Sequence, residues 1–91
     1  MGYKVELSKR AQKDLDKLDG TVVRMILKWL KKNIDDSNDP RIHGKALKGN
    51  LAGYWRYRVG DYRIICTIED DRLIVQVITI NNRSNVYERA Q

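Results

Sequence analysis

Two arginines on a short aromatic run are the residues of this sequence best placed to act on a charged substrate. Arg56 and Arg58 flank Tyr57 in the segment Tyr54-Trp55-Arg56-Tyr57-Arg58-Val59. A β-strand with this alternation puts both arginines on one face and the aromatic and aliphatic side chains on the other. The pattern therefore predicts a strand that joins a core through one face and presents cations to a polyanion on the other.

The positive charge of the chain is concentrated around this strand. The window 41–63 holds six cations and one acid, Asp61, so it carries +5 of the net +6. Lysines and arginines that neutralise phosphates gain affinity by releasing counterions, which makes nucleic acid, an acidic protein or both the leading partners. A basic composition that serves solubility alone is the alternative. The six cations are Arg41, Lys45, Lys48, Arg56, Arg58 and Arg63.

The sequence has little material for other chemistry. Cys66 is the only cysteine and His43 the only histidine, so neither an internal disulfide nor a zinc site of ordinary ligand number is expected, and we expect no cofactor. Cys66 is interpreted as a buried small apolar residue. His43 precedes the basic strand in a loop and is interpreted as structural or incidental, and Trp29 and Trp55 as packing residues.

The elements that position the arginines follow from periodicity. Alternation predicts a strand over 3–7, and Ser8 is a plausible N-cap for a helix over about 9–18. Thr21 is expected to cap a second helix that ends at about Asn33. A two-residue turn, Asp19-Gly20, would join the helices as an antiparallel hairpin.

The second half of the chain predicts a loop and a strand meander. Residues 41–53 read as a loop, followed by strands at about 54–59, 62–69 and 72–80. The tail could add a short element. The expected fold is α+β in the order βααβββ, one domain over 1–91, with the helix hairpin on one face of an antiparallel sheet. The covered face should include Trp55, Tyr57, Ile64, Cys66, Ile68, Val75 and Val77 or their alternates.

No apolar run approaches the roughly 20 residues of a membrane span, and the start lacks the apolar stretch of a secretory signal. We therefore expect a cytoplasmic protein that does not enter a membrane.

Several motifs along this chain resemble the RelE family of bacterial toxins, over nearly the whole length. They are Leu7 to Leu15 at the start, Lys45-Ala46-Leu47-Lys48-Gly49, the run from Gly53 to Ile65, and Asn82-Arg83-Ser84-Asn85-Val86-Tyr87. The resemblance implies the toxin of a type II toxin–antitoxin system, an mRNA interferase that cuts mRNA in the ribosomal A site. The family reaction needs no metal, because the ribose 2′-hydroxyl attacks the adjacent phosphate.

The resemblance also implies partners and site residues. The partners are a RelB-like antitoxin, the ribosome and mRNA, with operator DNA bound only through the antitoxin complex. By position, Arg56 and Arg58 match basic strand residues of the family, and Arg63 matches its phosphate-binding arginine. Arg83 matches a late arginine and Tyr87 the C-terminal tyrosine. The basic loop residues expected to bind RNA are Lys45, Lys48 and Arg41.

The sequence departs from the family where proton transfer is concerned. The best-known members have lysines at the positions of Arg56 and Arg58, and another branch has a glutamate base at the position of Lys45. Arginine is a poor base at pH 7, so Arg56 and Arg58 are interpreted as phosphate clamps. That leaves Tyr87, or no dedicated side chain, to handle the 2′ proton.

Other interpretations stay open at this point. Arg56 and Arg58 could be solvated strand positions, and Tyr87 could pack on the sheet edge. Arg63 could pair with Asp61 or with a distal acid, and Arg83 could be paired in a similar way. The chain could instead be a ParE-like toxin that inhibits DNA gyrase without catalysis. It could also be a nucleic-acid-binding module without activity.

Overall fold

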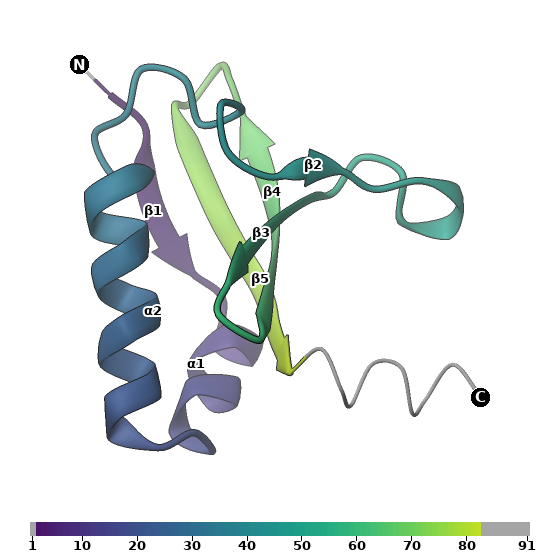
Figure 1. Cartoon of the computed structure of the whole chain (residues 1–91). Coiled ribbons are helices and arrows are strands. Elements are labelled where there is room, and N and C mark those ends of the chain that lie inside the picture. The colour runs from purple at the N-terminus through teal and green to yellow at the C-terminus, as the bar shows by residue number, and fades with distance from the viewer. Residues whose placement is uncertain (1, 83–91) are drawn as a thin grey trace.

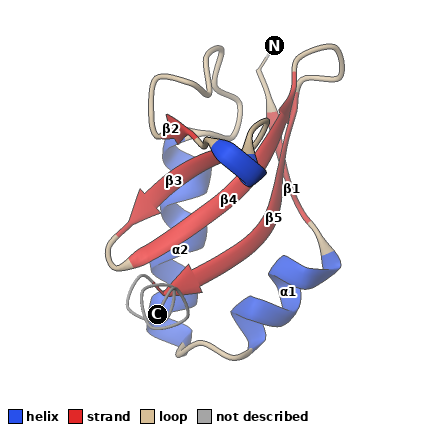
Figure 2. Ribbon diagram, turned by 90° about the vertical axis from the view of Figure 1, so that its right-hand side faces the viewer, coloured by secondary structure: helices blue, strands red, loops and turns tan. Residues whose placement is uncertain are grey.

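Five strands form one sheet in the order β1-β5-β4-β3-β2, and two helices lie on one side of it (Figures 1 and 2). The structure is a computed structural model that describes residues 2–82. In chain order its elements are β1 (Lys4–Leu7), α1 (Lys9–Asp16), α2 (Gly20–Asn33), β2 (Lys45–Ala46), the 3-10 helix η1 (Gly49–Leu51), β3 (Trp55–Val59), β4 (Tyr62–Glu69) and β5 (Ile74–Asn82). No helix within residues 2–82 is long and apolar enough to cross a membrane.

The predicted α+β architecture in the order βααβββ is confirmed, with two differences in the sheet. It is mixed, since β1 pairs in parallel with β5, from Lys4 opposite Ile74 to Leu7 opposite Val77. A parallel pair needs a long connection, and the helices and the other strands provide it. The segment expected to be a loop also contains β2, which pairs antiparallel with β3.

Side-chain caps decide where the helices begin. Ser8 caps α1 as predicted, since its Oγ accepts a hydrogen bond from the Ala11 amide at 3.0 Å. The predicted cap of the second helix was wrong by two residues. Asp19, not Thr21, is the N-cap of α2, and its carboxylate accepts from the Thr21 amide at 3.1 Å. A carboxylate also interacts favourably with the positive end of the helix dipole.

The core lies between the helices and the predicted face of the sheet. Tyr57, Ile64, Cys66, Val75 and Val77 are completely buried, and Trp55 and Ile68 pack against them. The helices contribute Ala11, Leu15, Ile26 and Leu30. Burial in this apolar surrounding raises the pKa of the Cys66 thiol, so the thiolate that nucleophilic chemistry needs is disfavoured.

Hydrogen bonds attach the loop before β2 to the side of β3. The Tyr57 hydroxyl donates to the Pro40 carbonyl at 2.7 Å, and the Trp55 indole donates to the His43 carbonyl at 2.8 Å. Gly44 follows with φ +82°, and a Cβ there would lie 2.2 Å from the Arg56 carbonyl oxygen. Only glycine fits so close to the neighbouring backbone. These contacts bring Lys45 alongside β3.

Helix α1 holds the second half of β5, beyond the end of β1. The Asp14 carboxylate accepts hydrogen bonds from the Thr79 hydroxyl at 2.7 Å and from the Ile80 amide at 2.9 Å. Ser8 donates through its hydroxyl to the Ile78 carbonyl at 2.7 Å. The β4–β5 register shifts by one residue beside this site. Side chains of α1 thus satisfy backbone groups that β1 is too short to reach.

Candidate functional site

Four cations meet on the face of the sheet opposite the helices. Arg58 lies directly opposite Arg63 in the β3–β4 pair, and Lys45 lies directly opposite Arg56 in the β2–β3 pair. Arg56 and Arg58 are two residues apart on β3 and so point to the same side. We refer to Lys45, Arg56, Arg58 and Arg63 as the basic patch. It is built from three adjacent strands, and the alternation predicted from the sequence is confirmed.

The patch combines exposed charge with a partly buried guanidinium. Lys45 and Arg58 are exposed, whereas Arg56 and Arg63 are half-buried. Within residues 2–82, Arg63 forms no ion pair, and the pair with Asp61 considered from the sequence is not formed. Its Nε is buried and has no hydrogen-bond partner in the described part of the chain. A buried donor left in this state costs free energy that an acceptor such as a phosphate oxygen would recover.

Arg41 lies outside the basic patch, in an ion pair. Its guanidinium donates to both carboxylate oxygens of Asp70, at 2.9 and 3.1 Å, and the Tyr3 hydroxyl donates to the same carboxylate at 2.6 Å. These contacts lower the pKa of Asp70 and raise the pKa of Arg41. Asp70 follows the last residue of β4 and Arg63 is the second residue of that strand, so at about 3.3 Å per residue the two ends lie roughly 20 Å apart.

The remaining predicted residues are placed as follows. Lys48 is exposed and immediately precedes η1, in the connection between β2 and β3 that extends away from the sheet (Figure 1). Arg83 and Tyr87 lie outside the described residues. Among those that are described, no group of three or more histidine, cysteine and acidic side chains could hold a metal ion.

A hollow of about 290 Å³ opens where the basic patch meets the edge of the sheet. Its lining residues are Trp29, His43, Gly44, Lys45, Arg56 and Arg58. Sequence reasoning had set His43 aside as incidental, yet the structure places it beside three cations. The signal in the sequence is that His43 precedes Lys45 by two residues. This signal is weak, because the segment was predicted to be a loop.

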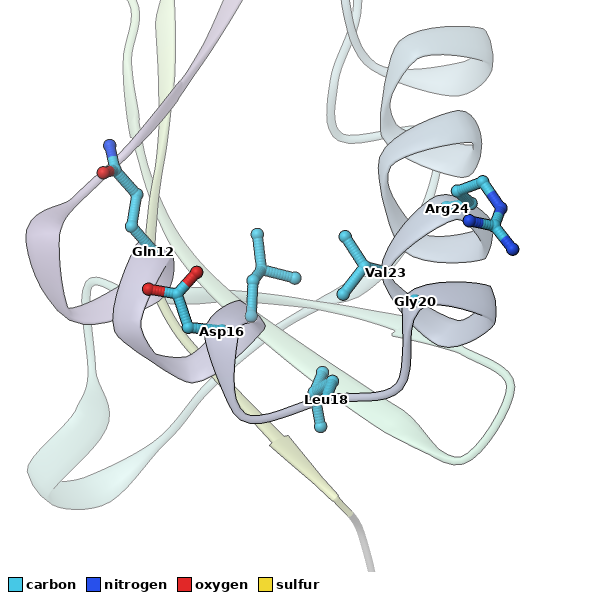
Figure 3. A pocket seen from close by; sticks show the side chains of 7 residues that line it. Gln12, Asp16, Leu18, Gly20, Val23 and Arg24 are labelled. Carbon is cyan, nitrogen blue, oxygen red and sulfur yellow. The ribbon is translucent and has the colours of Figure 1, made fainter.

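A larger open groove of about 510 Å³ lies between α1 and α2, away from the patch (Figure 3). Val23 points into it from α2, whereas the Arg24 side chain points away. The residues that line this groove are Gln12, Leu15, Asp16, Leu18, Gly20, Val23 and Arg24. None of them was a predicted site residue, and their mixture of polar and apolar groups gathers no charge of one sign.

Comparison with known proteins defines the class of the molecule. The family model for the ParE toxin of the type II toxin–antitoxin system parDE matches residues 5–87. Toxin RelG of Mycobacterium tuberculosis is 29% identical over 89 residues, which cover 98% of this chain and 100% of that relative. The mRNA interferase toxin RelE of Escherichia coli K12 is 34% identical over 93 residues, covering 99% of this chain and 95% of the relative.

Solved structures agree with this assignment. The toxin–antitoxin complex RelBE2 of Mycobacterium tuberculosis contains a chain that superposes with a TM-score of 0.83 at 26% identity, covering 92% of this chain and 94% of that one. The isolated Escherichia coli RelE toxin superposes with a TM-score of 0.71 at 28% identity, covering 98% of this chain and 95% of that one. The fold and the matches define a toxin of a type II toxin–antitoxin system. Within that class, the chain belongs to the RelE family.

Proposed function

We propose that this toxin is a ribosome-dependent endoribonuclease that cleaves mRNA in the A site without a metal ion. The observation that carries the proposal is the basic patch, where Arg58 and Arg63 face each other across two strands on the open face of the sheet. Like charges in direct opposition destabilise a sheet, so their placement calls for an anionic ligand. The Escherichia coli relative that covers the whole fold is named an mRNA interferase, which supports RNA as that ligand.

The patch suits phosphodiester cleavage by an internal nucleophile. When the ribose 2′-oxygen attacks the adjacent phosphorus, the pentacoordinate phosphate gains negative charge, and the bond from phosphorus to the 5′-oxygen then breaks. Fixed guanidinium groups of Arg56, Arg58 and Arg63 would stabilise that charge more strongly than the ground state. By the family motif, Arg83 and Tyr87 would complete the site from the C-terminal segment. Lys45 and Lys48 would hold the RNA backbone beside the cut.

A RelB-like antitoxin is the proposed partner in the cytoplasm. Relatives of this fold occur in structures described as RelBE toxin–antitoxin complexes. An antitoxin segment that covers the basic patch should be acidic, because cations buried without partners are costly. Operator DNA would be bound through the antitoxin in the complex.

The second function to weigh is inhibition of DNA gyrase by a non-catalytic toxin. The observation in its favour is that the matching family model describes a ParE toxin. The experiment is induced expression of the wild type and Arg63→Ala in bacteria, with primer-extension mapping of a translated mRNA and of the same transcript without a start codon. In-frame cuts confined to the translated message and lost in the variant would support the ribonuclease. Growth arrest with intact mRNA would refute it and favour gyrase.

A further inference from the structure

The lining of the hollow at the edge of the basic patch includes one histidine, His43, which can do chemistry that the arginines cannot. Lys45, Arg56 and Arg58 supply positive charge to it, but a guanidinium, which stays protonated at pH 7, cannot accept the proton of an attacking hydroxyl. Imidazole is the side chain whose ordinary pKa lies between pH 5 and 8, so it can accept a proton and return it. His43 lines the same hollow, and its ring contacts Trp29, another of the lining residues.

The position of His43 is held by two aromatic residues. Its carbonyl accepts the hydrogen bond of the Trp55 indole at 2.8 Å, and its ring meets the ring of Trp29 edge to face, with centroids 5.5 Å apart at 71°. The next residue, Gly44, lies against the backbone of β3. A side chain restrained in this way needs little further ordering when a substrate binds, as a proton-transfer group requires.

Among the described residues, the charged side chains that line the hollow with His43 are cationic. The groups that share its hollow are Lys45 of β2, Arg56 and Arg58 of β3, and the uncharged Trp29 of α2. Phosphate and ribose bound against the three cations would therefore lie next to the imidazole. The hollow's volume of about 290 Å³ is near the lower end of small-molecule sites, which suits one nucleotide rather than a longer segment.

We propose that this hollow binds one ribonucleotide at the cleavage point and that His43 transfers protons between its reacting oxygens. The inference rests on the ribonuclease function proposed above. In the first step the 2′-O–H proton passes to the neutral imidazole as the 2′-oxygen bonds to phosphorus. In the second, the bond between phosphorus and the 5′-oxygen breaks and the imidazolium returns a proton to that oxygen. The products are a 2′,3′-cyclic phosphate and a 5′-hydroxyl, and the enzyme is regenerated.

The test is single-turnover cleavage of mRNA on programmed ribosomes between pH 5 and 8.5, for the wild type, His43→Gln and Arg72→Gln. Arg72 is an exposed arginine in the turn at the far end of β4 and serves as the control. General acid–base groups contribute about 10²- to 10⁴-fold. The wild-type rate should rise with pH. His43→Gln should be slower by at least about 10²-fold and lose that rise, and Arg72→Gln should match the wild type.

A second measurement separates proton transfer from a loss of structure or binding. His43→Gln should bind ribosomes carrying a 2′-deoxy substitution at the cleavage point as the wild type does, within about twofold. For His43→Ala, added imidazole should restore part of the rate. If both variants cleave at the wild-type rate, or are slower with the wild-type pH profile and no imidazole rescue, the inference is wrong and the ribonuclease function stands. If the wild type itself does not cleave at any pH, the proposed function fails and the inference fails with it.

Discussion

Neutralising one arginine of the basic patch should stabilise the folded protein while weakening its action on RNA. Arg58 is exposed and lies directly opposite Arg63, and Arg56 is its neighbour on the same face of β3. We consider Arg58→Gln, which keeps most of the side-chain length and removes the charge. Because Arg58 is exposed, the substitution removes little buried apolar surface, so the change in electrostatic repulsion should dominate.

The size of the effect follows from the strand geometry. Like charges directly opposite in a sheet cost roughly 0.2–1 kcal/mol. Coulomb's law gives about 0.6 kcal/mol for two charges roughly 7 Å apart in water. Removing the repulsion between Arg58 and Arg63, and a similar repulsion from Arg56, should raise the free energy of unfolding by about 0.5–1 kcal/mol. For a domain of this size, that corresponds to roughly 2–6 °C in melting temperature.

The assay is urea denaturation and thermal melting of the wild type, Arg58→Gln and Arg72→Gln in low and high salt. Arg72 is the matched control, because its guanidinium pairs with the Glu69 carboxylate at 2.9 Å and has an acid rather than a cation beside it. Arg58→Gln should gain stability in low salt and lose most of the gain at 1 M salt, where the screening length falls to about 3 Å. Arg72→Gln should gain nothing. A gain in stability that is the same in low and high salt, or a loss of stability in Arg58→Gln, would refute the reasoning.

Three further predictions concern contacts that hold the loop before β2 and the Arg41–Asp70 ion pair. Tyr57→Phe removes the buried hydrogen bond to the Pro40 carbonyl and should lower the free energy of unfolding by about 1–3 kcal/mol in urea denaturation; an unchanged midpoint would show that the carbonyl finds another donor. Gly44→Ala places a methyl group 2.2 Å from a backbone oxygen at positive φ and should cost about 1 kcal/mol or more, with loss of amide protection in β2 by hydrogen exchange; full protection would contradict the predicted clash. Asp70→Asn should destabilise the protein at pH 7, because Arg41 lowers the pKa of this carboxyl in the folded state. That stabilisation is present above the ordinary carboxyl pKa of about 4 and is lost as the pH falls through the lower folded value. The difference in the free energy of unfolding between the wild type and Asp70→Asn should therefore shrink at pH 3. A difference that does not depend on pH would contradict this prediction.

Local patterns in the sequence were sufficient to predict the helices and most of the strands, and to predict which side chains of β3 face the core. Alternation along 54–59 assigned Arg56 and Arg58 to the open face and Tyr57 to the core, and both assignments are confirmed. These predictions succeed because side-chain direction depends on backbone geometry over a few residues. The N-cap of α2 was missed because Asp19 and Thr21 both have the chemistry of a cap.

Charge along the sequence was a poorer guide to which cations act together. Arg41 belongs to the basic window 41–63, but its partner Asp70 lies 29 residues further along the chain. His43 was interpreted as structural or incidental because it lies in the loop before the basic strand and matches no family role, and its neighbours Trp29 and Trp55 come from α2 and β3. Such pairings depend on the path of the loop before β2, which no short-range pattern encodes.

The sequence by itself determined the family, the order of elements and the side of β3 that carries positive charge. The tertiary structure decided that Arg58 meets Arg63, that Lys45 meets Arg56, that Arg41 is withdrawn into an ion pair, and that β1 runs parallel to β5. The physical reason is the range of the interactions involved. Periodicity and capping act within a few residues, whereas strand register and loop attachment are set by packing between segments distant in the chain.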